Sequence, residues 1–94
     1  MEQTYFILLY YCYTEINDPE QYREQHHMLC LDLGLRGRII IAKEGINGTV
    51  SGTQEATETY MRQMKADPMF ASVEFKVEAH HEHAFQKLHV RVKI

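Results

Sequence analysis

The sequence predicts an α+β fold in which one β-sheet is covered on one face by two α-helices. Two segments carry apolar residues at helical spacing behind capping residues. The segments around them have strand-like patterns: continuous apolar runs, a β-branched run, or alternation between apolar and polar residues. The chain has 94 residues, of which 45% are hydrophobic and 24% charged. This length and composition predict a single small globular domain over residues 1–94.

The first strand is predicted over residues 5–13, which are apolar or aromatic at every position. Such a run is typical of a strand inside a sheet that is covered on both faces. Alternate side chains of a strand point to opposite faces, so Phe6, Leu8 and Tyr10 share one face. Helices cover only one face of a two-layer domain, and we place these three residues on the open face as candidates for an interdomain contact.

Both helices have recognisable ends. The first begins after Asp18, a capping residue, and ends at Gly34, which suits a left-handed stop. The second begins after Thr53 and ends at Asp67-Pro68. Cys30 falls in the apolar stripe of the first helix, which predicts a buried packing residue and not a nucleophile.

A β-hairpin is predicted between the helices. The β-branched run 39–41 is followed by Glu44, Gly45, Asn47 and Gly48, and then by a second short run. Asn-Gly is the strongest short hairpin signal because both residues tolerate positive φ, so we place the tip of the turn at Asn47-Gly48. Gly45 is then either part of a longer loop or a bulge that re-aims Glu44.

Two further strands are predicted at the C-terminal end, over residues 73–78 and 88–94, since apolar and polar residues alternate in both. With right-handed crossovers, this order of elements predicts a ferredoxin-like (acylphosphatase-like) two-layer sandwich. The expected topology is βαββαβ plus a terminal strand, with an antiparallel sheet and both helices on one face.

The formal net charge of -3 argues against a free-standing nucleic-acid binder, but six of the ten basic residues fall within two short segments that contain no acid, residues 34–43 and 86–94. Basic side chains gathered on one face of a sheet can contact RNA phosphates. The alternative is an edge strand whose charges only maintain solubility. The candidates for RNA contact are Arg36, Arg38, Lys87, His89, Arg91 and Lys93.

Several other activities find little support. An acylphosphatase needs a glycine-rich phosphate loop with an arginine after the first strand, whereas residues 14–19 contain neither and carry two acids. His81 and His83 could share one face of an extended segment, with Glu82 between them, but the sequence places no fourth ligand for a metal. We therefore expect no catalytic residue, no metal and no cofactor in this chain.

No apolar run approaches the roughly 20 residues needed to span a bilayer. The N-terminus has no basic region before its apolar run and does not resemble a secretion signal. Cys12 and Cys30 are too few for a disulfide scaffold. We expect a cytoplasmic protein with reduced thiols.

Motifs along the whole chain form an ordered set. The most specific are Glu-Gly-Ile-Asn-Gly-Thr at residues 44–49 and His-Ala-Phe at 83–85, accompanied by Leu-Gly-Leu-Arg-Gly-Arg-Ile at 33–39 and Ala-Asp-Pro at 66–68. Together they resemble the N-terminal domain of the bacterial rhodanese-related tRNA uridine hydroxylases.

The resemblance implies that a rhodanese domain follows residue 94 in the parent protein, which converts the wobble uridine of certain tRNAs to 5-hydroxyuridine with molecular oxygen. The reactive cysteine of that family lies in the rhodanese domain, and neither Cys12 nor Cys30 matches its motif. The chain is then expected to be an accessory, substrate-positioning domain that is not catalytic alone.

Two alternatives remain open. The domain could be purely structural, packing on the rhodanese domain or associating with itself without RNA contact. An independent enzyme using the histidine cluster is the third hypothesis. Within the hairpin motif, Glu44 and Asn47 either project toward the neighbouring active site or serve only the turn.

Overall fold

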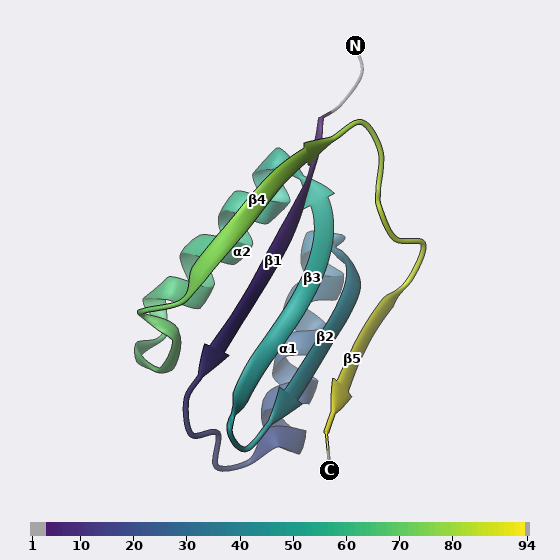
Figure 1. Cartoon of the computed structure of the whole chain (residues 1–94). Helices are drawn as coiled ribbons and strands as arrows, with labels where there is room; N and C mark the ends of the chain where they lie inside the picture. Colours follow the sequence, from purple (N-terminus) through teal and green to yellow (C-terminus); the bar gives the residue numbers. More distant parts are fainter. Residues whose placement is uncertain (1–3, 94) are drawn as a thin grey trace.

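The computed structural model describes residues 4–93 and has two layers, a five-stranded sheet and two helices packed on one of its faces (Figure 1). The order of strands in the sheet is β4-β1-β3-β2-β5. This arrangement confirms the predicted α+β class. In chain order the elements are β1 (Tyr5–Tyr13), α1 (Pro19–Leu33), β2 (Arg36–Ala42), β3 (Gly45–Thr53), α2 (Gln54–Ala66), the 3₁₀ turn η1 (Pro68–Phe70), β4 (Glu74–His80) and β5 (Leu88–Val92).

The sheet is mixed, so the expectation of a wholly antiparallel sheet was wrong. β5 pairs with β2 in parallel, whereas the other neighbours are antiparallel. The connection after β4 crosses one end of the sheet to the opposite edge, and this reverses the chain so that β5 runs beside β2 in the same direction (Figure 1). Helix α1 helps to hold this edge, because Arg23 Nε donates a hydrogen bond to the Val90 carbonyl at 2.7 Å.

The core lies between the sheet and the helices, and it overturns the placement of the interdomain candidates. Leu8 is fully buried, Tyr10 is 5% exposed, and Phe6 is half-buried. These residues share the face of β1 that packs against the helices, where Tyr60 and Phe70 are also fully buried. Both faces of β1 are apolar or aromatic in sequence, so no alternation of apolar and polar residues marks the face that the helices cover.

The predicted helix ends are confirmed. The Asp18 side chain accepts a hydrogen bond from the Gln21 amide at 3.1 Å, and Gly34 has φ 71° at the end of α1. The Thr53 hydroxyl accepts from the Ala56 amide at 3.1 Å and caps α2. Cys30 is fully buried, as its place in the apolar stripe predicted.

The hairpin forms, but its tip is Lys43-Glu44 and not Asn47-Gly48. Asn47 and Gly48 lie inside β3, where Gly48 pairs with Tyr10 on one side and Ile39 on the other. Among residues 4–93 only glycines have positive φ, so Asn47 does not take a turn conformation. Gly48 is needed for close packing, since a Cβ there would lie 2.6 Å from the Tyr10 hydroxyl.

Within residues 4–93, neither helix has the length and apolar character that crossing a membrane would require.

Candidate functional site

The face of the sheet opposite the helices, here called the open face, carries the candidate site. Residues paired across neighbouring strands project to the same side of a sheet. One row of paired residues therefore crosses all five strands on the open face. From β4 to β5 it contains Glu74, Tyr11, Asn47, Ile40 and Arg91.

The predicted basic residues gather on one half of the open face. Arg38 of β2 pairs with His89 of β5, and Arg91 pairs with Ile40. The parallel pairing of β2 with β5 thus joins two basic segments that are some fifty residues apart in sequence. All six candidates are exposed: Arg36, Arg38, Lys87, His89, Arg91 and Lys93.

Aromatic side chains occupy the open face of β1, beside the basic half. Tyr11 is 68% exposed and Tyr13 is 82% exposed, and Leu9 lies on the same face. The two tyrosine rings meet edge to face, with centroids 5.7 Å apart and planes at 70°. The sequence analysis did not predict this exposed tyrosine pair. The tyrosines at odd positions of β1 were the available signal for the exposed face, because Tyr tolerates exposure better than Leu or Phe.

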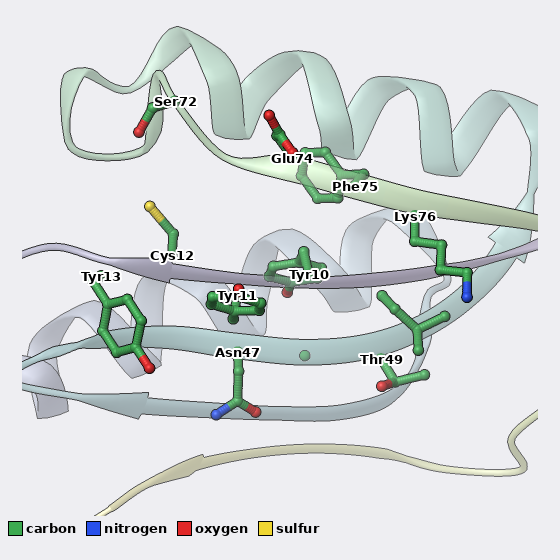
Figure 2. Close-up of a pocket in the computed structure, with 12 residues that line it drawn as sticks. Tyr10, Tyr11, Cys12, Tyr13, Asn47, Thr49, Ser72, Glu74, Phe75 and Lys76 are labelled. Atoms are coloured by element: carbon green, nitrogen blue, oxygen red, sulfur yellow. The ribbon is translucent and has the colours of Figure 1, made fainter.

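Two shallow hollows flank this tyrosine pair. The larger, of about 830 Å³, lies along β1 toward β4, and Tyr11, Tyr13, Asn47, Glu74 and Lys76 are among the residues that line it (Figure 2). The smaller, of about 450 Å³, lies toward β2 and is also lined by Tyr11, Tyr13 and Asn47. The tyrosine pair therefore stands between two spaces open to solvent.

The hairpin-motif residues have separate positions. Glu44 lies at the exposed turn, where its Oε1 is 3.9 Å from Lys93 Nζ. Gly45 begins β3 with φ 148°, and a Cβ there would lie 2.1 Å from the Cys12 carbonyl oxygen. Asn47 is exposed on the open face, whereas Gly48 is buried. Of the four, Asn47 has the side chain best placed to meet a ligand on this face.

His83, in the loop between β4 and β5, packs on the open face near Tyr5 of β1 and Ser51 of β3. Its Nδ1 lies 3.0 Å from Oγ of Ser51, which is fully buried, and its ring centroid lies 4.6 Å from that of Tyr5. Burial and the neighbouring Arg36 lower the pKa of His83. Residue 83 therefore attaches the loop to β1 and β3, whereas the ring of His81 stacks on that of His80.

The segment after β1 is arranged as a structural loop. The Thr14 amide donates to the Glu44 carbonyl at 3.1 Å, and the Ile16 amide donates to the Lys43 carbonyl at 3.0 Å. The Asp18 side chain caps α1. These two amides are already committed within the protein, so they are not free to bind a phosphate. Among residues 4–93, no three His, Cys, Asp or Glu side chains converge as metal ligands.

A buried polar chain connects the helices to β1. His26 Nε2 lies 2.7 Å from the Tyr60 hydroxyl and its Nδ1 lies 3.2 Å from that of Tyr22, and the Tyr60 hydroxyl also hydrogen-bonds with Tyr10. Burial lowers the pKa of His26 to about 4 and raises the pKa of Cys30 to about 12. A fully buried thiol with that pKa is a poor nucleophile, which agrees with the predicted packing role of Cys30.

Comparison with known proteins identifies relatives across the whole chain. The model of the family described as the UPF0176 acylphosphatase like domain matches residues 5–94. A protein of Cytophaga hutchinsonii named tRNA uridine(34) hydroxylase is 68% identical over 89 residues, which are 95% of this chain and 28% of that protein. One of the same name from Bacillus licheniformis is 55% identical over 91 residues, which are 97% of this chain and 28% of that protein. The chain thus spans little more than a quarter of the relatives' length.

Among solved structures, the dark state of BlrB, a BLUF protein, matches with a TM-score of 0.73. The match covers 97% of this chain and 75% of that chain, at 18% sequence identity. At this identity the likeness supports the fold and nothing more.

Proposed function

We propose a function from the family of this chain, which belongs to the UPF0176 acylphosphatase-like domains. The chain positions tRNA for a larger uridine hydroxylase and is not catalytic alone. The names and lengths of its relatives support this proposal, since they are called tRNA uridine(34) hydroxylase and extend far beyond the matched region. In the proposed longer protein, a rhodanese domain follows this chain and carries the reactive cysteine, and the complete protein uses molecular oxygen. The proposed location is the cytoplasm.

One observation carries the proposal: the pairing of β2 with β5 brings the basic residues of both strands together on the open face. Arg38 and His89 are direct neighbours across β2 and β5, and Arg36 and Arg91 lie on the same side of the sheet. Local positive charge of this kind attracts the phosphates of RNA although the whole chain has a formal net charge of -3.

The proposal can be tested by titrating unmodified tRNA into this chain at several salt concentrations. We expect saturable binding that weakens as salt rises, with amide shifts at residues 36–38 and 87–93. Arg38→Gln and Arg91→Gln should each weaken binding and reduce the magnitude of the salt slope by about one. The control is Arg62→Gln, which removes the same charge from an exposed residue of α2 in the other layer.

Unchanged affinity in both open-face variants would refute the tRNA contact. That result would favour a second candidate function. In it, the domain packs on the rest of the polypeptide or on another copy of itself. The exposed apolar side chains of β1, Leu9 and Tyr11, favour this alternative. It predicts concentration-dependent broadening of signals along residues 5–13 without any RNA.

A further inference from the structure

We infer that Tyr11 and Tyr13 form a stacking site for unpaired bases, so that the open face binds a single-stranded stretch of RNA and not a duplex. This inference rests on the proposed function and specifies the form of RNA that the same face recognises.

The exposure and arrangement of the two rings carry the first step. Each ring is more than two-thirds exposed, and the planes meet at 70° with centroids 5.7 Å apart. A planar base can lie flat on one ring while the edge of the other ring borders it. Stacking of this kind tolerates any base, because every base has a π-face.

The hollows beside the rings supply space and a polar contact. The hollow of about 830 Å³ lies on one side of the pair and that of about 450 Å³ on the other. Asn47 lines both hollows, and its side chain is exposed on the open face. An amide has two donors and an acceptor to offer the edge of an unpaired base.

The charges of the open face orient the RNA. Arg38 and Arg91 lie on the β2–β5 side. On β4, beyond β1, the two acids Glu74 and Glu78 outnumber the one base, Lys76, whose Nζ is 3.9 Å from Glu78 Oε1. Phosphates therefore favour β2 and β5, and the bases extend toward β1. Arg91 is three strands from Tyr11, a separation of about 14 Å at the usual strand spacing.

A duplex cannot use these groups in the same way. The bases of an A-form helix are already paired and stacked, and the deep, narrow major groove keeps side chains from their edges. Two exposed rings beside a basic strip instead match the recognition of splayed, single-stranded bases.

The test compares two RNAs of equal length, a hairpin with an unpaired loop and a blunt duplex, binding to this chain. We expect the hairpin to bind more tightly. Tyr11→Leu and Tyr13→Leu should each weaken hairpin binding roughly 5- to 150-fold with little change in the salt slope, whereas Tyr11→Phe keeps the ring and retains affinity. Thermal unfolding of each variant establishes that the fold is intact.

The outcomes separate the inference from the proposed function. If both RNAs bind equally and the leucine variants bind as well as the parent chain, while Arg38→Gln still weakens binding, the stacking site is refuted and the tRNA contact stands. If neither RNA binds in a salt-dependent manner, both the stacking site and the tRNA contact are refuted. If Tyr11→Leu instead abolishes self-association of the chain, the tyrosine pair is a protein contact and the inference is wrong.

Discussion

Tyr10 lies directly against Gly48 of the neighbouring strand, so that a Cβ at residue 48 would be 2.6 Å from the Tyr10 hydroxyl oxygen. The same hydroxyl hydrogen-bonds with Tyr60 inside the buried polar chain. Tyr10 therefore cannot move aside without disturbing that chain. The requirement for glycine at residue 48 comes from packing between strands and not from a turn.

Gly48→Ala should lower the free energy of unfolding by about 1–3 kcal/mol, because the added methyl group overpacks the contact with Tyr10. Urea unfolding of the chain measures this. Asn47→Ala is the control, since its side chain is exposed and the change should stay within about 0.5 kcal/mol. A larger loss for Asn47→Ala than for Gly48→Ala would mean that the pair acts as a turn after all.

The stability of the chain should fall as the pH drops from about 6.5 to about 4. Folding lowers the pKa of His26 from 6.5 to about 4 through burial, so over this range the unfolded chain binds a proton that the folded chain excludes. The full effect is about 3 kcal/mol, present above pH 6.5 and lost toward pH 4. Denaturant unfolding at a series of pH values tests it.

His26→Gln should flatten this part of the pH profile, because glutamine cannot titrate. His27→Gln controls for the loss of a histidine from the same helix. A His26→Gln profile as steep as that of the parent chain would assign the pH dependence to other groups.

Ser51→Ala should loosen the loop between β4 and β5. The substitution removes the hydrogen bond between Ser51 Oγ and His83 Nδ1, which should cost about 0.5–1.5 kcal/mol. Hydrogen exchange at residues 81–87 should accelerate, while the exposed Ser72→Ala leaves it unchanged. Equal protection in both variants would show that the contact of the His83 ring with the Tyr5 ring suffices to hold the loop.

The chain should not hydrolyse acyl phosphates above the spontaneous rate, despite the name of its domain family. The amides of Thr14 and Ile16 are held by the β2–β3 turn, and the segment carries the acids Glu15 and Asp18. Ultraviolet assay of an aromatic acyl phosphate measures the rate, and inorganic phosphate should leave the amide shifts of residues 14–18 unchanged. Turnover, or phosphate-dependent shifts there, would contradict this assignment.

Local features of the sequence determined the order of the elements and the ends of both helices. Asp18 and Thr53 cap helices and Gly34 ends one, because capping depends on a few adjacent residues. The burial of Cys30 followed from the helical spacing of apolar residues, and the two basic segments were visible in the order of residues along the chain.

The tertiary structure alone decided which of these residues meet. The run in β1 is apolar on both faces, so only the docking of the helices makes Leu8 core and Tyr11 surface. Asn47-Gly48 resembles a turn in sequence, but the close approach of Tyr10 is what requires the glycine. The crossing of the chain to the far edge sets β5 parallel to β2 and brings Arg91 into one row with Tyr11. Such long-range placement depends on how the layers pack, which no local pattern encodes.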